Sequence, residues 1–573
     1  MPFRPTPPRL RATGLSRQAS RRLIPRLTAL ALAISLSVGA VSSLQAQGAA
    51  PGAVPSAVPS AVRLPSLGEA ASDDFNLSQE KRIGEQIMRE IRRDPDYLDD
   101  ALLLDYLQTL WRPLVQAARA RGDIGVDTER LFPYEVFLVR DRSVNAFALP
   151  GGFVGVHLGL IALTANADEL ASVLAHELSH ITRRHIARSI SAASQSSTLG
   201  LVATLLGLLV ASRANSSDAA QAAIMGGQAA MAQSQLNFSR DMEREADRTG
   251  LALMGEAGFA PSGMAGMFDK LDQSARLNDN GGFPYLRSHP LTTDRVGEAR
   301  QMVQSAAGNV LAARAVAPVT ALGHSLMQAR ARVLMDPSAQ AVRRLQDLDG
   351  RGAMPSLNAA DRLVGLYTGA LASTQLRDFA RAAQATQAAQ ALVDAMGPDT
   401  DPMARQAVAH LDARLALAGG DGARAAAALA PLAGPSRANL LLGAEVALAQ
   451  GTDLALQRGA ETLQTWVSEH REDASAWQLL SQTSQQLGQR LRALRAEAEA
   501  QAALGNLPGA IDRLRAGQQL ARGQQAGGST GRTDFIEASV IDARLRDLIN
   551  QRRELMADQR RASGNSRSAP PPE

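Results

Sequence analysis

The feature that most constrains this chain is the pentapeptide His176–His180, a His-Glu-x-x-His motif inside a stretch of helical periodicity. Residues four apart lie on one face of a helix, so His176 and His180 can present two imidazoles to one metal ion. Glu177 lies beside the first of them and can act as a general base on water. Because Asn166 is a suitable N-cap upstream, the sequence predicts that the motif lies within a helix.

A second acidic stretch supplies candidates for the remaining ligand. The chain of 573 residues contains no cysteine, so a metal must be held by His, Asp or Glu. A zinc ion held by two histidines needs a third protein ligand and an open position for water. Glu243 and Asp247 lie four apart on one predicted helical face, from which Glu245 points away. Glu243 can then be a ligand, while Asp247 accepts a hydrogen bond from a ligand histidine and fixes its tautomer. The alternative is a solvated charged helix face, which the upstream motif disfavours.

Two further residues are candidates for catalysis. His289 precedes a proline and so lies at a turn, where it can stabilise an oxyanion or occupy the fourth position on the metal and exclude water. Arg295 can stabilise developing negative charge. His157 and His185 are interpreted as structural residues rather than as ligands. The other histidines are assigned to the packing or the surface of the C-terminal helices: His324, His410 and His470.

A change of period between residues 134 and 160 predicts strands ahead of the metal-binding helix. β-Branched and aromatic residues predict one strand at 134–139, and a Pro-Gly-Gly turn separates two more, at 145–149 and 153–160. Such a strand can bind an extended peptide by pairing with it, and a glycine within it suits the close approach of another backbone. The candidate substrate strand consists of Phe153, Val154, Gly155 and Val156. The residues alone leave open the alternative that these strands only build the core.

The N-terminus, residues 1–46, is predicted to be a cleavable export signal. Seven arginines and no acids occur in residues 1–26, and a short apolar run follows at 27–41. That run is shorter than a membrane span, which favours a cleaved signal over a retained anchor. The formal charge of +4 falls to about −3 without those seven arginines, so the basic balance is no argument for a nucleic-acid partner. Residues 47–74 are rich in Ala, Pro and Ser and are predicted to be a flexible tether.

Helices broken by small-residue turns are predicted throughout the C-terminal half. Glycine-containing turns recur about 15–17 residues apart, with one double interval. They lie at Gly419-Gly420, Gly434, Gly451, Gly488 and Gly505. Two such steps approximate the tetratricopeptide unit of about 34 residues. The sequence therefore predicts an all-α tetratricopeptide-like repeat domain at 311–525, followed by a helical and then disordered tail at 526–573. Its concave surface would bind a client or partner; the alternative is a plain helical cap.

Four segments occur in one order along the chain: NAFALPGG at 145–152, HELSH at 176–180, SRDMEREAD at 239–247 and SHPLTTDR at 288–295. In this order they resemble the Ste24/HtpX-type gluzincin metallopeptidases. With the export signal and the helical repeats, the chain is most similar to exported members of that family that carry tetratricopeptide repeats. The resemblance implies an α+β zincin-type metallopeptidase domain at 75–310, mostly helical with a small sheet.

The resemblance also implies one Zn²⁺ per chain and a role for each matching residue. The residues are His176, His180 and Glu243 as ligands, Glu177 as catalytic base, Asp247 as the support of a ligand histidine, and His289 with Arg295 as a pair near the metal. In that family the histidine of this pair can be a fourth ligand that keeps the peptidase latent.

The resulting hypothesis is a periplasmic zinc metalloendopeptidase that cleaves misfolded or stalled envelope proteins and that can lie at the periphery of the outer membrane. By resemblance, its substrates are polypeptides such as unfolded outer-membrane proteins, and its repeats contact the outer-membrane β-barrel assembly machinery. A second hypothesis is a periplasmic chaperone or assembly scaffold whose peptidase site is latent. A third is a membrane-anchored protease that retains residues 1–46.

Overall fold

The structure is a computed structural model. It describes residues 76–192, 239–277, 284–310, 319–526 and 532–564, apart from positions 398, 433 and 435. The predicted signal at 1–46, the predicted tether at 47–74 and the end of the predicted tail lie outside the described residues. Among the residues that are described, no helix is both long enough and apolar enough to cross a membrane.

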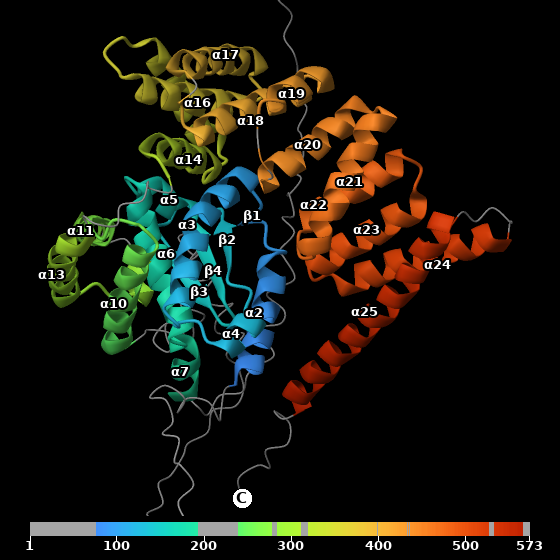
Figure 1. Cartoon of the computed structure of the whole chain (residues 1–573), viewed down its shortest axis with the longest axis horizontal. Helices are drawn as coiled ribbons and strands as arrows, with labels where there is room; N and C mark the ends of the chain where they lie inside the picture. Colours follow the sequence, from blue (N-terminus) through green and yellow to red (C-terminus); the bar gives the residue numbers. More distant parts are fainter. Residues whose placement is uncertain are drawn as a thin grey trace, which may run out of the picture. The chain divides into compact units, whose positions relative to one another are not determined.

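A four-stranded sheet is built from the segment between residues 97 and 157 (Figure 1). Its strands lie in the order β1-β2-β4-β3, with β2 and β4 parallel and both outer pairs antiparallel. The bounds are Tyr97–Leu98 for β1, Glu135–Val139 for β2, Ala146–Leu149 for β3 and Phe153–His157 for β4. The predicted small sheet is therefore confirmed, and β1 is an addition that the sequence did not signal.

The last predicted strand is too long by three residues. β4 stops at His157, and helix α5, Leu158–Leu163, follows at once. Gly159 lies so close to the main chain of Arg142 that a Cβ would be 2.2 Å from its carbonyl oxygen, and the chain turns there. The prediction of a strand at 158–160 is wrong because a short apolar run has no period that separates a strand from a buried helix.

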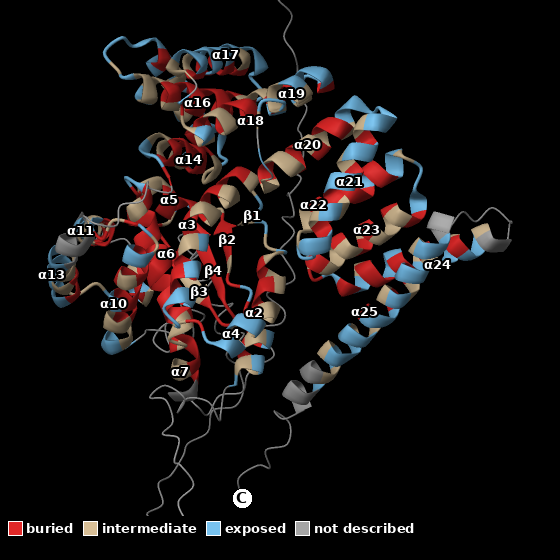
Figure 2. Cartoon of the chain, viewed as in Figure 1, coloured by how far each residue is buried: buried red, intermediate tan, exposed pale blue. Residues whose placement is uncertain are grey.

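Helices cover both faces of the sheet. Side chains alternate along a strand, so Val136 and Val154 pack with α3 and α6, whereas Phe137 and Phe153 pack with α2 and α7. These helices are α2, Leu77–Ile91; α3, Ala101–Ala120; α6, Ala167–Thr182; and α7, His185–Ala192. Figure 2 shows the strands and α6 as largely buried. The short α4, Val126–Leu131, precedes β2.

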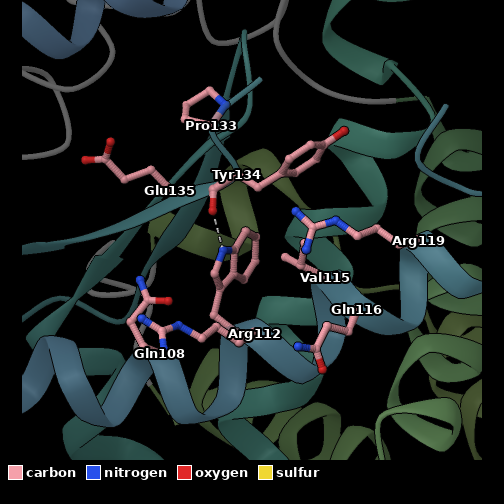
Figure 3. Close-up of a pocket in the computed structure, with 9 residues that line it drawn as sticks. Gln108, Arg112, Val115, Gln116, Arg119, Pro133, Tyr134 and Glu135 are labelled. Atoms are coloured by element: carbon pink, nitrogen blue, oxygen red, sulfur yellow. Dashed lines mark hydrogen bonds between the residues drawn. The ribbon is translucent and has the colours of Figure 1, made fainter. Parts of the chain in front are cut away.

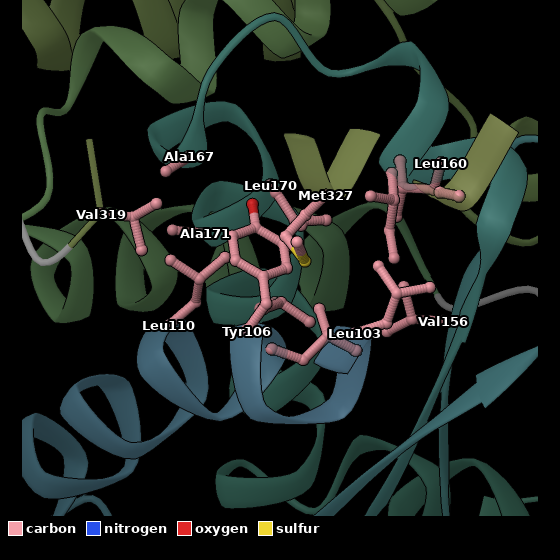
Figure 4. Close-up of a cluster of buried hydrophobic side chains, with 14 of the residues drawn as sticks. Leu103, Tyr106, Leu110, Val156, Leu160, Ala167, Leu170, Ala171, Val319 and Met327 are labelled. Carbon is pink, nitrogen blue, oxygen red and sulfur yellow. The ribbon is translucent and has the colours of Figure 1, made fainter. Parts of the chain in front are cut away.

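The larger core lies where α3 and α6 meet the sheet (Figure 4). Leu103, Tyr106 and Leu110 of α3 and Leu170 of α6 are each at most 1% exposed. Burying one such side chain contributes about 1.5–3 kcal/mol. Met327 of α14, Ala321–Leu334, belongs to the same cluster, so the core includes residues well beyond the predicted boundary at 310.

The chain crosses from one face of the sheet to the other between α6 and α7. Helix α6 ends at Thr182, and Arg184 has φ of +52°, in the left-handed region that residues with a side chain seldom adopt. The Arg184 guanidinium pairs with the buried carboxylate of Glu80 at 3.2 Å, which holds this turn against α2. Helix α6, which carries the motif, therefore stays on one face of the sheet, while Ile186 of α7 packs on the other face.

Four more helices are described between residues 239 and 310. They are α10, Arg240–Glu256; α11, Ser262–Leu277; α12, Pro284–Ser288; and α13, Thr293–Val310. Among them, α10 and α11 both pack on α6. The helix that carries the motif is thus enclosed by α3, α10, α11 and the sheet.

All regular elements described after residue 319 are helices, as predicted. After α14 they are α15, Ala339–Gln346; the 3-10 helix η2, Asp347–Ala353; α16, Ala359–Gln375; α17, Phe379–Met396; α18, Pro402–Ala418; α19, Gly422–Leu429; α20, Arg437–Gln450; α21, Asp453–Glu469; α22, Ala474–Gln486; α23, Arg490–Ala503; α24, Leu507–Ala526; and α25, Arg532–Gly564. Predicted turns at Gly451, Gly488 and Gly505 follow helix ends and have positive φ, between 62° and 73°. Whether the helices are tetratricopeptide repeats stays a prediction.

Charged contacts join the first half to the helices that follow. Asp100, the N-cap of α3, accepts two hydrogen bonds of 2.7 Å from Arg330 of α14. Arg437 of α20 lies between Asp99 and Asp473, with contacts of 2.6–2.8 Å. Because α14, α16 and α18 also share the core of α3 and α6, the sheet region and the first helices after residue 319 are packed together. A separate domain at 311–525 stays a prediction.

Candidate metal centre

The His-Glu-x-x-His motif lies within α6, and its side chains are buried. Asn166 caps the helix by accepting a hydrogen bond of 2.9 Å from the main-chain N–H of Glu169. The Nε2 atoms of His176 and His180 are 3.0 Å apart, and both rings are at most 2% exposed. The four-residue spacing therefore brings the two imidazoles to one point, as expected for a helix.

Helix α10 approaches α6 closely and carries the acidic residues. Gly250 permits the approach, because a Cβ there would lie 3.1 Å from the main-chain nitrogen of His176. Glu243, in the first turn of α10, places Oε1 3.5 Å from His180 Nε2 and Oε2 3.6 Å from His176 Nε2. The partial positive charge at a helix N-terminus favours a carboxylate at this position.

His289 joins the cluster just after α12. Its Nδ1 lies 3.0 Å from Glu243 Oε1 and 3.3 Å from His176 Nε2, and its Nε2 lies 3.4 Å from Glu177 Oε1. The Tyr285 ring stacks on it, with ring centroids 4.7 Å apart. The candidate ligand atoms of four buried residues then lie within 4.8 Å of one another: His176, His180, Glu243 and His289.

The donor set fits a tetrahedral metal ion. Zinc bonds of about 2.0–2.2 Å place neighbouring ligand atoms roughly 3.3–3.6 Å apart, and five of the six pairs among the four groups have contacts of 3.0 to 3.6 Å. Both carboxylate oxygens of Glu177 are buried, and within the described part of the chain neither has a hydrogen-bond partner. Three carboxylates are buried here, of Glu177, Glu243 and Asp247, and the buried Arg295 guanidinium pairs with the last two. A cation would complete this charge balance, because buried charge is costly without compensation.

Asp247 and Arg295 lie behind the four-residue cluster. Asp247 Oδ1 is 2.9 Å from His176 Nδ1, the position of an acceptor that orients a ligand histidine. Arg295 donates from Nε to Asp247 Oδ2 at 2.7 Å and from Nη2 to Oδ1 at 2.8 Å, and its Nη1 lies 2.8 Å from Glu243 Oε2. The Arg295 guanidinium thus faces these two carboxylates of the chain itself, and its assistance to developing negative charge on a substrate stays a prediction.

The carboxylates shift the pKa values of their neighbours. Burial acts to lower the pKa of His176, but Asp247 and Glu243 outweigh it and raise the pKa to about 10. Burial acts to raise the pKa of Glu243, yet His289 and His176 hold it well below its usual range. Burial and the neighbouring His176 lower the pKa of His180. The centre therefore stabilises positive charge placed between its carboxylates, which is the requirement of a cation site.

The histidines interpreted as structural lie outside the four-residue cluster. His157 ends β4, with its Nδ1 2.9 Å from Ser143 Oγ. His324 is buried and its Nδ1 lies 2.6 Å from the Tyr106 hydroxyl. His410 is also buried, and the ring of His470 stacks on Trp466. Packing therefore accounts for these four.

Two contacts at the centre were missed by the sequence analysis. His185 begins α7, and its Nδ1 lies 2.9 Å from Nδ1 of His180. Glu245 points away from the metal ligands, as predicted, and reaches His185 Nε2 at 3.1 Å. The stacking of Tyr285 on His289 was also missed. Each contact depends on a turn or an approach between helices, which local periodicity does not encode.

The predicted substrate strand is not a free edge of the sheet. β4 contains Phe153, Val154, Gly155 and Val156, and it pairs with β2 on one side and with β3 on the other. The Phe147 ring covers Gly155 and would lie 2.4 Å from an added Cβ, so this glycine accommodates a side chain of β3. The prediction that β4 accepts a substrate strand is therefore wrong, because strand order cannot be read from the period of a single strand.

The open edge belongs to β3. Among the described residues, no strand pairs with the side of β3 that faces away from β4. Asn145 O accepts from His157 N, whereas Val144 O accepts from Tyr285 N on the opposite side. Main-chain groups alternate in direction along an antiparallel strand, so those of Ala146 and Ala148 point toward the side of Tyr285. Because β3 also packs beside α6, this edge adjoins the metal centre.

A separate open cavity of about 410 Å³ lies between α3 and the residues that lead into β2 (Figure 3). Trp111 Nε1 donates to the carbonyl oxygen of Tyr134 at 2.6 Å, and Arg112 and Arg119 line the cavity. None of the lining residues belongs to the four-residue cluster. The cavity is therefore distinct from the metal centre.

Two histidines of a His-Glu-x-x-His helix and a glutamate from a second helix form the ligand set of many metallopeptidases. The site therefore places this part of the chain among the metallopeptidases. Residues 109–303 match Peptidase family M48, so the chain contains a metallopeptidase domain of that family.

Similar proteins share this region. The β-barrel assembly-enhancing protease of Escherichia coli (strain K12) is 34% identical over 237 residues, which are 41% of this chain and 46% of that protein. The Yersinia pestis protein of the same name is 35% identical over 238 residues, with the same coverage of 41% and 46%. The mitochondrial metalloendopeptidase OMA1 of Saccharomyces cerevisiae is 32% identical over 198 residues, 33% of this chain and 53% of that protein. The chain thus spans about half the length of the curated relatives it matches.

Proposed function

We propose that the chain is an exported zinc metalloendopeptidase that hydrolyses peptide bonds in misfolded or stalled envelope polypeptides. The observation that carries the proposal is Glu177, which is fully buried beside the four-residue cluster and, among the described residues, has no hydrogen-bond partner for either carboxylate oxygen beyond a 3.4 Å contact with His289. Such burial costs on the order of a few kcal/mol or more. A carboxylate kept there at that cost favours a role in chemistry over a role in stability.

The proposed ligands are His176, His180 and Glu243. When bound, Zn²⁺ supplies a Lewis acid that polarises a peptide carbonyl and lowers the pKa of water. Glu177 accepts the proton of the attacking water and delivers it to the leaving amine nitrogen. His289 lies 3.4 Å from Glu177, within reach of the reacting groups, and it is equally placed to be a fourth ligand.

The proposed substrate path is the open edge of β3. A polypeptide in extended form would pair with the outward main-chain groups of Ala146 and Ala148 and so lie beside α6. Main-chain pairing is independent of side chains, which suits a protease of many unfolded clients. Phe147 of β3 pairs with Gly155 of β4, and its ring packs over that glycine. This contact supports β3 on the side away from the proposed substrate.

The experiment is cleavage of an unfolded outer-membrane polypeptide by purified wild type and Glu177→Gln. General acid–base groups contribute about 10²–10⁴-fold to rate, so the variant should lose at least about 10²-fold while retaining zinc and its melting temperature. Glu256→Gln, at the exposed end of α10, is the matched control and should cleave normally. Cleavage by Glu177→Gln at the wild-type rate would refute the mechanism.

A second candidate function is a chaperone or assembly scaffold with a latent peptidase. The observation in its favour is His289, whose ring lies among the proposed ligands. The name of the relatives, β-barrel assembly-enhancing protease, suggests a partner in the outer-membrane β-barrel assembly machinery, and the helices after residue 319 offer surface for it. Complementation separates the functions: if Glu177→Gln corrects the envelope defects of a deletion strain as well as wild type does, binding is the main function.

A further inference from the structure

The two proposed histidine ligands are supported in different ways. His176 has a carboxylate, Asp247, directly at its second ring nitrogen. The second nitrogen of His180, Nδ1, lies 2.9 Å from another imidazole, that of His185. His185 Nε2 in turn lies 3.1 Å from Glu245 Oε2. Both rings of this pair are fully buried, so their polar atoms depend on one another.

The directions of these hydrogen bonds follow from the chemistry at each end. An ionised carboxylate only accepts, so His185 carries its hydrogen on Nε2 and donates it to Glu245. His185 Nδ1 is then an acceptor and receives the hydrogen on His180 Nδ1. His180 is left with a lone pair on Nε2, the atom 3.0 Å from His176 Nε2 at the proposed metal position.

The local fold holds this arrangement in place. The left-handed turn at Arg184 makes His185 the first residue of α7 and brings its ring back toward the last turn of α6. Glu245, on α10, accepts a hydrogen bond of 3.0 Å from Arg188 Nη1 and lies 3.8 Å from Arg183 Nε. Three helices therefore fix the carboxylate that ends the chain of hydrogen bonds.

We propose that His185 and Glu245 are positioning residues that select the metal-binding tautomer of His180 through this two-step hydrogen-bond relay. The inference rests on the proposed function, because it assumes that His180 binds a metal. The inference gives a functional role to His185, a histidine outside the His-Glu-x-x-His motif. Partners of this kind typically change metal affinity about 10–100-fold when removed.

The test is the dissociation constant of Zn²⁺, measured by competition with a chromogenic chelator on full-length protein. We expect His185→Leu to weaken binding about 10–100-fold. Glu245→Ala should also weaken it, with the metal-free melting temperature unchanged, because that side chain is 38% exposed. Glu245→Gln retains an acceptor oxygen and should restore affinity close to wild type. Glu256→Ala, on the same helix, is the control.

A spectroscopic readout accompanies the affinity. In the Co²⁺-substituted protein, the visible absorption bands should shift in His185→Leu and Glu245→Ala and should return in Glu245→Gln. Wild-type affinity and spectrum in Glu245→Ala, or equal losses in Glu245→Ala and Glu245→Gln, would overturn the relay even if His185→Leu fails to fold. Wild-type protein that binds no Zn²⁺ would refute the proposed function and the relay with it, whereas unchanged variants would refute the relay alone.

Discussion

At the scale of single residues, His289 lies close both to proposed metal ligands and to the proposed general base. One nitrogen faces Glu243 and His176, and the other faces Glu177. The stacked ring of Tyr285 limits its movement. A residue held in this way can complete the ligand set and leave water no place beside the general base, which would make the resting site inactive.

The variant His289→Ala tests this latency. Three ligands remain, so we expect zinc to be retained and cleavage of an unfolded polypeptide to rise severalfold. Zinc content and cleavage rate are measured on the same preparation. Ser288→Ala is the neighbouring control. In the wild type, the Ser288 hydroxyl donates a hydrogen bond to the carbonyl oxygen of Tyr285. If zinc is retained but activity is lost, His289 assists catalysis and is not an inhibitory ligand.

At the scale of elements, α2 approaches the turn between β3 and β4 especially closely. A Cβ at Gly84 would lie 2.0 Å from the carbonyl oxygen of Pro150, in the turn between β3 and β4. This turn directly follows β3, the strand whose edge adjoins the metal centre. The contact is between backbones, so neither side can yield by changing a rotamer.

Gly84→Ala should therefore destabilise the fold. Overpacking of this kind costs about 1–3 kcal/mol, which would appear as a lower free energy of unfolding in urea. Gly297→Ala, in α13, is the matched control, because no atom lies within 4 Å of the added Cβ. An exposed helical glycine changed to alanine should leave stability unchanged or raise it by up to about 1 kcal/mol. A Gly84→Ala protein as stable as wild type would show that the approach is not tight.

The elements also show what a sequence can and cannot predict here. The side-by-side placement of His176 and His180 follows from helical spacing, and so does that of Glu243 and Asp247. The choice of β3 over β4 as the open edge depends on strand order, and the direction of Arg295 depends on how α13 packs against α10. Likewise, His185 meets His180 only because of the turn at Arg184. Local periodicity therefore predicted which residues of one helix lie side by side. Tertiary packing determined which residues of other elements they contact.

At the scale of the whole molecule, charged and polar contacts join α3 to the helices beyond residue 319. His410 of α18 lies in this region, with Nε2 2.7 Å from Asn439 Oδ1 of α20. Burial lowers the pKa of His410 to about 4; the Asn439 hydrogen bond acts to raise it, as does Asp100, whereas Arg330 and Arg414 lower it further. The folded protein therefore keeps this imidazole neutral where an unfolded chain would protonate it.

This difference predicts a loss of stability on mild acidification. The unfolded pKa is about 6.5, so below that value the unfolded state binds the proton and the folded state does not. The contribution of His410 to stability is full above pH 6.5 and falls down to about pH 4, at about 1.4 kcal/mol per pH unit and by at most about 3.5 kcal/mol. Melting temperatures at pH 7.5 and 5.0 should differ less in His410→Gln than in wild type. His470→Gln is the control, and an equal pH effect in His410→Gln and wild type would contradict the prediction.

The residues of the metal centre are far apart along the chain, and this affects when the centre forms during folding. His176 and His289 are 113 residues apart, and closing so long a loop costs chain entropy that is recovered only when α6, α10 and α12 have docked. A chain that has formed only its first helices holds the two histidines of α6 and no complete centre. Under the proposed function, proteolytic competence therefore arrives only with the finished fold.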